Sequence, residues 1–382
     1  MADMLEYLAW RGDVSHIQSP WNDVDSLILA TLSYLDYPQE PTALRDLAIT
    51  LPLLGEDVIG FFRDTRALLS AASLTERFAG VMMHSPHAEL DQARRIQFAA
   101  VTADLMNGSH YLAFRGTDNT IVGWKEDFTM AFESPIPAQE AAVNYLRRVA
   151  ADTEGPLILG GHSKGGNLAV YAAAHAEPDV RRRIRAIYSF DGPGVDDATI
   201  VSDGYAAIAR RIRSFVPQAS VIGLLMAYHP EYTVIRSTGS GLLQHDPFTW
   251  QVLGTGFVTV PEVDVSSQVV DQTVHAWLAK VTPEQRRRFV ETLFGLLEAT
   301  GATTMKELLR DVPGRVSAII RALARVDFDT ARMILSLLGQ FVSIGTQNVL
   351  ELIRLRLSPG QGALPQSTKG DVSDECRGKS EE

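Results

Sequence analysis

A glycine-rich segment around Ser163 constrains the fold of this chain more than any other feature. Residues 160–166 read Gly-Gly-His-Ser-Lys-Gly-Gly, and they follow a short apolar stretch and open a helical pattern over 165–176. Gly161, Ser163 and Gly165 form the pattern G-x-S-x-G, which is typical of a sharp strand-to-helix turn with a serine at its tip. Glycine is needed two positions to either side of the serine, because a Cβ there would collide with the neighbouring elements. The segment therefore predicts a nucleophile elbow.

Such a turn pushes the serine hydroxyl out at the carboxyl end of a sheet. The amide N–H of Lys164 and the N-terminus of the next helix would then face a developing oxyanion. We therefore predict Ser163 as the nucleophile, Lys164 as one oxyanion-hole donor, and His162 as part of the elbow. The alternative is an ordinary glycine-rich turn. A nucleotide-binding loop is disfavoured, because neither the G-x-x-x-x-G-K-[ST] nor the G-x-G-x-x-G order occurs.

Strand and helix patterns alternate around this turn. The pair Asn107-Gly108 predicts a hairpin between the first two strands. Strand patterns lie at 97–103, 111–114, 157–159, 186–190, 214–216 and 232–235, and helical patterns at 138–151, 165–176 and 205–213. This alternation predicts an α/β fold, with a mainly parallel sheet that helices cover on both faces.

Helical patterns flank this alternating region. Residues 1–36 form a short helical lead-in, residues 41–76 read as further helices, and every periodic segment from 282 to 356 is helical. We expect a domain boundary between 261 and 282. The predicted parts are an α/β domain over 1–280, a helical C-terminal region over 281–357 and a disordered tail over 358–382.

Composition excludes several classes of function. The net charge of −11 argues against sequence-independent binding of nucleic acid. Cys376 is the single cysteine, which excludes an intramolecular disulfide and a zinc-cysteine site and fits a reducing compartment. The first residues carry an acid where a signal peptide needs basic residues, so we expect a cytoplasmic protein. Residues 333–350 are uncharged but rich in polar side chains, which favours a packed or amphipathic helix over a membrane span.

Two further segments, taken with the elbow, resemble the class 3 lipase family. Residues 114–117 read Phe-Arg-Gly-Thr and residues 124–128 read Trp-Lys-Glu-Asp-Phe, followed by the Gly-His-Ser of the elbow. An uncharacterised bacterial branch of these lipase-like proteins is more similar still, because it carries Gly-His-Ser-Lys-Gly-Gly, Asp-Gly-Pro-Gly and Gln-His-Asp. The resemblance covers about residues 1–280. It implies an α/β-hydrolase fold with a C-terminal helical extension outside the family pattern, and a hydrolase that needs neither a metal nor an organic cofactor.

The resemblance also assigns the second half of the oxyanion hole. Thr117 matches the position whose backbone amide, with its hydroxyl as a further candidate, joins the N–H of Lys164. Lys164 stands where the lipases have leucine. Two interpretations of its ammonium stay open: a solvated first-turn lysine paired with a nearby acid, and a group that binds an anionic part of the substrate.

The general base must be a histidine that follows Ser163, because the fold orders its triad as nucleophile, acid and base. His175 lies in the helix after the nucleophile, and His275 lies in a helical pattern that suits packing. His229 and His245 are both in loop-like stretches. We choose His245, because the family's histidine follows a similar late strand; an ordinary turn histidine is the alternative.

The acid is harder to assign. The lipases place it in an Asp-x-Val-Pro segment, but this chain reads Ser-Phe-Val-Pro from Ser214. Asp191, at the end of the preceding strand, is the preferred substitute, since a carboxylate is needed to orient the histidine. An Asx turn is its alternative role, and Asp196, Asp197 and Asp246 are the other candidate acids.

Two functions follow from these assignments. The first is an esterase or lipase-like hydrolase that acts on a small-molecule ester or a lipid through an acyl-enzyme. The second is a degenerate hydrolase fold that serves as a binding or scaffold module, which the serine at the usual acid position favours. Neither function predicts a nucleic-acid partner, and peripheral contact with a membrane is not favoured.

Overall fold

The computed structural model describes residues 2–51, 61–91, 94, 96–117, 121–130, 133–220, 223, 231–264 and 282–301. Several predictions lie outside these residues: those for His229 and His275, for the helical segments beyond 302, and for the tail with Cys376.

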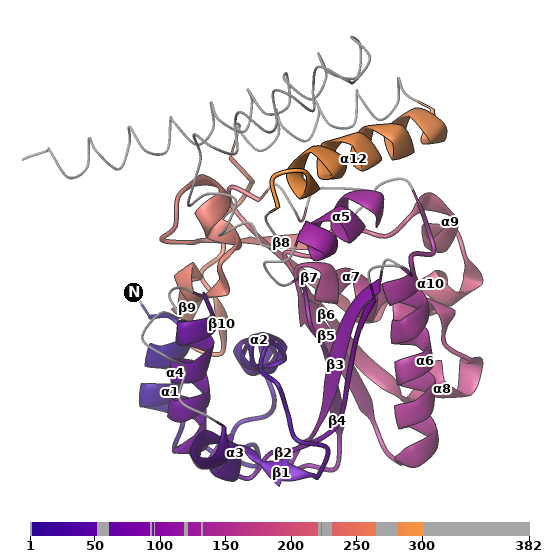
Figure 1. The fold of residues 1–382 in the computed structure, drawn as a ribbon. Coiled ribbons are helices and arrows are strands. Elements are labelled where there is room, and N and C mark those ends of the chain that lie inside the picture. Colours follow the sequence, from indigo (N-terminus) through magenta and orange to yellow (C-terminus); the bar gives the residue numbers. More distant parts are fainter. Residues whose placement is uncertain are drawn as a thin grey trace, which may run out of the picture.

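An eight-stranded sheet runs through the middle of the molecule (Figure 1). Its strands lie side by side in chain order. The first four pair antiparallel, and from the fourth to the eighth every pair is parallel. The strands are β1 (Thr42–Ala43), β2 (Met82–Asp91), β3 (Ile96–Asp104), β4 (His110–Phe114), β5 (Leu157–His162), β6 (Ile184–Phe190), β7 (Ile212–Pro217) and β8 (Tyr232–Ile235). A separate ribbon consists of β9 (Val252–Leu253) and β10 (Gly256–Phe257).

Helices cover both faces of the sheet (Figure 1). Because parallel strands follow one another in chain order, right-handed crossovers place the connecting helices on one face. These helices are α6 (Pro137–Asp152), α7 (Lys164–His175), α8 (Pro178–Arg183) and α10 (Asp203–Ile208). The other face is covered by α1 (Met4–Arg11), α2 (Asp23–Leu32), α3 (Leu44–Thr50) and α4 (Phe61–Ser73). The helical lead-in is therefore a structural layer.

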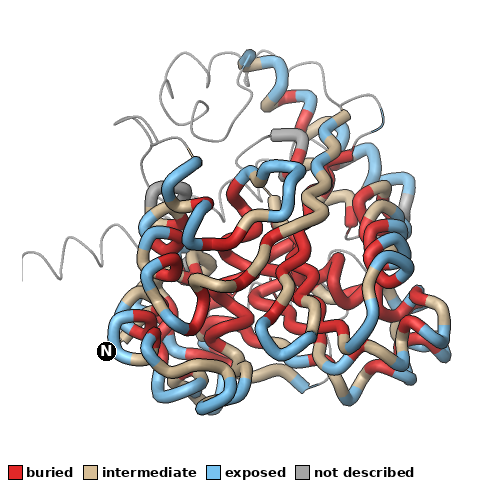
Figure 2. The backbone as a smooth tube through the Cα atoms, turned by 90° about the horizontal axis from the view of Figure 1, so that it is seen from below, coloured by how far each residue is buried: buried red, intermediate tan, exposed pale blue. Residues whose placement is uncertain are grey.

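The two largest clusters of the core lie on opposite sides of the sheet. Along β4, Tyr111 and Ala113 belong to the cluster under the N-terminal helices, and Leu112 and Phe114 belong to the cluster under the crossover helices. This follows from the two-residue period of a strand. Seen from below, the buried residues gather in the middle of the molecule (Figure 2).

A fully buried ion pair fixes the N-terminal layer. Asp25 belongs to the capping box of α2 with Asn22, and it also accepts a hydrogen bond from Tyr7 Oη at 2.8 Å. Arg77, which follows α4, donates to both carboxylate oxygens of Asp25, at 2.7 and 2.5 Å. Its remaining N–H groups donate to three backbone carbonyls of residues 14–20. All five donors of the guanidinium are used.

Two helices lie above the carboxyl ends of the parallel strands, α5 (Ile121–Met130) and α12 (Pro283–Glu298) (Figure 1). Their contact includes Phe128 and Phe294, with ring centroids 5.6 Å apart, and an ion pair between Lys125 and Glu298 at 3.1 Å. Thr282 caps α12 with a capping box, close to the predicted helix start. The division of the chain into domains stays a prediction.

The predicted fold class is confirmed: an α/β-hydrolase fold with helices on both faces of the sheet. The hairpin at Asn107-Gly108 is also present, with Gly108 at φ 80°. Three details were wrong. Thr42–Ala43 is a short strand that pairs with Met82–Met83, where a helix start was predicted. The helix predicted over 205–213 ends at Ile208, since Ile212 already pairs with Ile187. The antiparallel strand β2 was not predicted, because its polar residues and a bulge interrupt the apolar alternation.

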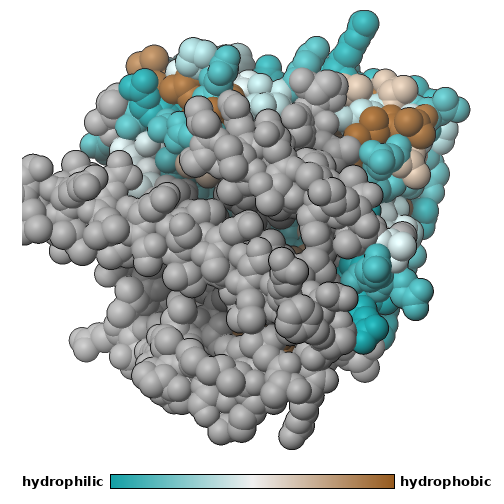
Figure 3. Space-filling view, turned by 90° about the horizontal axis from the view of Figure 1, so that it is seen from above, coloured by the Kyte–Doolittle hydropathy of each residue, from teal (hydrophilic) through white to brown (hydrophobic). Residues whose placement is uncertain are grey.

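Within the part of the chain that the structure describes, no helix has the length and apolarity that a membrane crossing requires. The view from above shows hydrophobic side chains of the described residues only in small groups among hydrophilic ones (Figure 3).

Candidate active site

Ser163 lies at a strained turn between β5 and α7. Its backbone has φ 57° and ψ −133°, a conformation that non-glycine residues rarely adopt. Its N–H donates to the carbonyl of Phe190, at the end of the neighbouring strand, at 2.9 Å. A Cβ on Gly161 would lie 2.3 Å from the carbonyl carbon of Gly165, and one on Gly165 would lie 2.1 Å from the oxygen of Phe114. The two glycines are therefore required by close packing around the turn.

The first turn of α7 follows Ser163 directly. Lys164 is the first residue of this helix, and the backbone N–H groups of a first turn have no partner within the helix. The positive end of the helix dipole also lies at this first turn, next to Ser163. This arrangement can stabilise a negative charge that develops next to Ser163.

His245 and Asp191 are in direct contact. The Nδ1 atom of His245 lies 2.6 Å from Oδ2 of Asp191, whose residue is 1% exposed. The other carboxylate oxygen accepts from Ser220 Oγ at 2.5 Å and from the N–H of Gly223 at 3.2 Å. An ionised carboxylate only accepts, so Nδ1 carries the proton and Nε2 is left as the basic nitrogen.

Asp191, the preferred candidate for the acid, lies at the end of a strand, as its position in the sequence predicts. It follows β6 directly and has φ 49°, a left-handed conformation. Its N–H donates to the carbonyl of Phe215 at 2.8 Å. Because His162 and Phe190 are register partners at the ends of β5 and β6, Ser163 and Asp191 leave two adjacent strands at the same edge of the sheet.

His162 supports the backbone of His245. Its Nε2 lies 2.8 Å from the carbonyl oxygen of His245, and its Nδ1 lies 3.2 Å from the hydroxyl of Tyr34. The carbonyl can only accept, so Nε2 carries the proton and the tyrosine hydroxyl donates to Nδ1. Burial, reinforced by the neighbouring His245, holds the pKa of His162 well below its usual range. A neutral His162 therefore anchors the segment that carries His245, a role that the sequence did not reveal.

The ring of His245 is 26% exposed. Among the described residues, no hydrogen bond joins this ring to the Ser163 hydroxyl. Contacts of this kind are often long before substrate binds and tighten in the complex. His245 ends the short 3₁₀ segment Gly241–His245, and Trp250 fixes this segment by donating from Nε1 to the carbonyl of Gln244 at 2.7 Å.

Thr117 lies beside the elbow and is hydrogen-bonded to Asp127. Its hydroxyl donates to the Asp127 carboxylate, whose oxygens lie 2.6 and 2.5 Å away. The hydroxyl is thus engaged, which leaves the backbone amide of Thr117 as its candidate oxyanion donor. A Cβ on Gly116 would lie 2.5 Å from the carbonyl oxygen of His162, so only glycine allows this loop to approach the elbow. Burial raises the pKa of Asp127 to about 6, against the opposing effect of Lys164.

The Lys164 side chain is buried, so the prediction of a solvated lysine was wrong. Its ammonium forms an ion pair with Glu126 at 2.7 Å, as the same interpretation expected of a nearby acid. It also donates to the backbone oxygen of Gln97 at 2.9 Å and to the Gln97 side chain at 2.5 Å. All three protons of the ammonium have acceptors within the protein. The structure therefore does not favour the alternative in which Lys164 binds an anionic substrate group.

The other candidate acids have different roles. Asp246 accepts from the N–H of Phe248 at 3.0 Å and caps a 3₁₀ turn. Asp196 caps α9 (Asp197–Ile200), and Asp197 is exposed in that helix. Among the candidate histidines, His175 is exposed at the end of α7, where it stacks on Tyr171.

Comparison with known proteins identifies the family. The chain is similar to a crystal structure of M37 lipase, with 14% identity, a TM-score of 0.34, and coverage of 52% of this chain and 68% of the lipase chain. That likeness is too remote to bear on the fold or the activity. No curated protein matches the chain significantly. The model of the Mbeg1-like family matches residues 72–295, more than half of the 382 residues. The lipase-like resemblance is supported, and the narrower bacterial branch stays a prediction. The chain belongs to the Mbeg1-like family.

Proposed function

We propose that this protein is a serine hydrolase that cleaves a carboxylic ester through an acyl-enzyme. One observation carries the proposal: the strained Ser163 and the His245–Asp191 pair lie at the same edge of the sheet, where β5 and β6 end. Strain of this kind at a polar residue costs of order 1–3 kcal/mol and persists at functional sites. The lipase-like family adds support.

In the proposed reaction, Ser163 Oγ attacks the ester carbonyl and passes its proton to Nε2 of His245. Asp191 holds the imidazole in the required tautomer and stabilises the imidazolium that forms. The oxyanion accepts hydrogen bonds from the backbone N–H groups of Lys164 and Thr117. His245 then protonates the departing alcohol, and a water molecule hydrolyses the acyl-enzyme in a second, equivalent step. Apart from this water molecule, the steps use side chains and backbone groups of the protein.

The substrate class is a small-molecule ester or a lipid ester. Because the Lys164 ammonium is held by Glu126 and Gln97, the proposal includes no requirement for an anionic group next to the scissile bond. A cytoplasmic location remains part of the proposal, since a chain with a single cysteine suits a reducing compartment.

The competing function is a scaffold built on an inactive hydrolase fold. Its support was Ser214, which stands at the family's usual position for the acid. The contact between Asp191 and His245 weakens that support, because a carboxylate from the neighbouring strand is available for the same task.

Labelling with a fluorophosphonate probe separates the two functions. We expect the wild-type protein to be labelled at Ser163, and Ser163→Ala to lose both labelling and ester turnover, by as much as about 10⁶ in kcat. The melting temperature should change little, since only a hydroxyl is removed. Ser214→Ala is the matched control and should be labelled normally. A wild-type protein that resists the probe while folded, or labelling that persists in Ser163→Ala, would contradict the proposal.

A further inference from the structure

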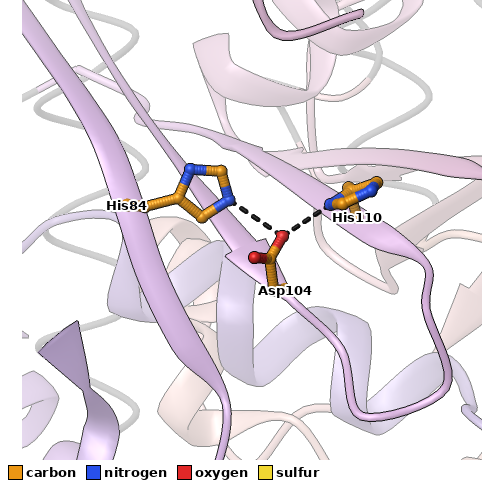
Figure 4. Close-up of side chains that lie close together, drawn as sticks. All are labelled: His84, Asp104 and His110. Atoms are coloured by element: carbon orange, nitrogen blue, oxygen red, sulfur yellow. Dashed lines mark hydrogen bonds and ion pairs between the residues drawn. The ribbon is translucent and has the colours of Figure 1, made fainter. Parts of the chain in front are cut away.

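A second polar cluster lies at the opposite edge of the sheet from Ser163. It consists of His84 in β2, Asp104 at the end of β3 and His110 at the start of β4 (Figure 4). The Nε2 atom of His84 lies 2.9 Å from Oδ1 of Asp104, and the Nδ1 atom of His110 lies 2.5 Å from the same oxygen. Two imidazole nitrogens therefore converge on one carboxylate oxygen.

The register of the antiparallel strands brings these residues together. Asp104 and His110 are direct partners across the β3–β4 hairpin. A bulge in β2 between His84 and His87 interrupts the pairing with β3, and Ser85 within it has φ 50°. Tyr145 donates to the carbonyl of Ser85 at 3.0 Å and so holds the bulge. Bulges re-aim side chains, and this one follows His84 directly.

His110 makes a second hydrogen bond with its outer nitrogen, the one that does not face Asp104, and this bond fixes its tautomer. Its Nε2 lies 2.6 Å from the backbone carbonyl oxygen of Glu154. A carbonyl can only accept, so Nε2 must carry a proton. In a neutral imidazole, Nδ1 then presents a lone pair toward the Asp104 carboxylate. Two lone pairs at 2.5 Å repel each other. A second proton on the imidazole would relieve the repulsion at this distance, and a metal ion would relieve it once the two atoms had moved apart to about 3.3 Å, as two bonds of about 2.0 Å require.

His84 has a similar arrangement. Its outer nitrogen, Nδ1, lies 2.9 Å from the hydroxyl of Ser85, which can accept its proton. In that tautomer the inner nitrogen also directs a lone pair toward Oδ1 of Asp104; in the other tautomer, in which the Ser85 hydroxyl donates to Nδ1, the inner nitrogen carries the proton and donates to Oδ1. Histidines that bind metals typically donate their other N–H to a carbonyl, a carboxylate or water, which orients the ring. Both histidines of this cluster have such an outer partner.

We propose that His84, Asp104 and His110 bind a divalent transition metal, with Zn²⁺ as the best fit. Two imidazoles and one carboxylate suit zinc, whereas magnesium and calcium prefer oxygen ligands. The three ligand atoms lie within 4.8 Å of one another. In a tetrahedral site with bonds of about 2.0 Å, ligand atoms lie roughly 3.3 Å apart. The Asp104 side chain, 44% exposed, is free to retract by the difference, and water can fill the fourth position.

A metal ion at the proposed site would act on the stability of the sheet and not on the proposed ester hydrolysis. The site joins three consecutive strands at the amino ends of the parallel strands, since His110 pairs with Leu157 at the start of β5, whereas Ser163 follows the other end of β5. Bound zinc would stabilise the folded state through mass action and leave ester turnover unchanged. The proposal is thus independent of the proposed hydrolase activity.

Zinc binding by the full chain tests this proposal. The protein is prepared without a histidine tag and with Cys376→Ser, which removes the single thiol, and zinc is titrated against a chromophoric chelator. We expect one bound ion, a rise in melting temperature on addition of zinc and its reversal by EDTA. His110→Asn and His84→Gln should weaken binding by at least the roughly 100-fold that outer-shell partners cost. His87→Gln, on the same strand but outside the cluster, is the matched control.

Three results would overturn the metal site: no zinc retained by the folded wild-type protein, equal binding by His110→Asn, or equal weakening by His87→Gln. A melting temperature that responds to pH through His110 but not to zinc would identify a protonated histidine–aspartate pair instead. If the histidine variants do not fold, Asp104→Asn, at the more exposed position, should fold and still lose zinc.

Discussion

Two buried ion pairs, one under the N-terminal helices and one beside Ser163, differ in how fully they are hydrogen-bonded. Arg77 uses all five of its donors on Asp25 and three carbonyls. Lys164 is equally well supplied with acceptors, but its partner Glu126 has one oxygen, Oε1, that is buried without a hydrogen-bond partner in the described structure. The first pair is complete, and the second leaves a polar atom unsatisfied.

Backbone strain follows the same division. Ser163 and Asp191 both have positive φ, and both lie at the edge of the sheet that contains the candidate site. The N-terminal layer instead has two helices with complete capping boxes, begun by Asp3 and Asn22. Between these two regions, local rules are obeyed in the layer that only has to be stable and broken where chemistry is proposed; the third described non-glycine residue with positive φ, Ser85, lies in the bulge of β2, outside both regions. The comparison therefore predicts that changes near Ser163 alter activity and that changes near Arg77 alter only stability.

The largest effect should come from Asp191→Asn. The variant keeps the shape of the side chain but favours the wrong tautomer of His245, so we expect a loss on the order of 10⁴ in kcat. Asp246→Asn, at a residue that caps a turn beside the base, should lose far less. Ester turnover at saturating substrate measures both. A crippled Asp246→Asn with a mild Asp191→Asn would mean that the acid is misassigned, although Ser163 could still be the nucleophile.

The next largest effect should be the loss of stability when the cation of either buried ion pair is replaced. Arg77→Met and Lys164→Leu each leave a buried carboxylate without its partner, so each should lower the free energy of unfolding by about 3–5 kcal/mol. Urea denaturation measures this loss. Adding Glu126→Leu to Lys164→Leu should restore much of the stability, because the unpaired charge is removed. Adding Asp25→Leu to Arg77→Met should not, because Asp25 also caps α2 and accepts from Tyr7.

Activity per folded molecule sharpens the same comparison. We expect this activity to be unchanged in Arg77→Met and reduced in Lys164→Leu. Lys164 is the first residue of α7, the helix that follows the proposed oxyanion hole. Equal activities in the two variants would show that the second pair is as purely structural as the first.

The smallest effect concerns pH. Asp127 keeps its proton in the folded protein up to about pH 6, because burial raises its pKa, whereas in the unfolded chain it loses the proton near pH 4. The folded state therefore binds more protons at this residue between these values, and the contribution of Asp127 to stability is lost as pH rises from about 4 to 6. Asp127→Asn should escape this loss, which amounts to at most about 3 kcal/mol. Urea denaturation at several pH values measures it; parallel curves for the two proteins would contradict the assignment.

Much of the parallel half of the molecule could be predicted from the sequence. The strand at 232–235 matches β8, and the elbow follows β5, because apolar runs and glycines report local geometry directly. Chain order and family likeness point to His245, and a position at the end of the preceding strand points to Asp191, where the family pattern has its acid at Ser214; in the structure the two side chains lie 2.6 Å apart.

The contacts that the sequence did not reveal are those between distant segments. Nothing in the pattern around Lys164 distinguishes a solvated ammonium from one buried against Glu126, because the ion pair depends on how α5 folds over the elbow. The same holds for His162 and Tyr34, which are 128 positions apart. Likewise, His84, Asp104 and His110 form no recognisable spacing, since a hairpin and a bulge bring them together.

The order of the strands has a consequence for biosynthesis. Each strand of the sheet lies beside the one made immediately before it, so a growing chain can extend the sheet one strand at a time, always onto an edge that already exists. Contacts between neighbours in the chain form early because little loop entropy is lost. Contacts with the segment that follows β8 must wait; in one of them, the N–H of Val252 donates to the carbonyl of Ala2 at 2.7 Å. The first helices to be synthesised are thus fastened at their outer end only after the whole sheet has been made.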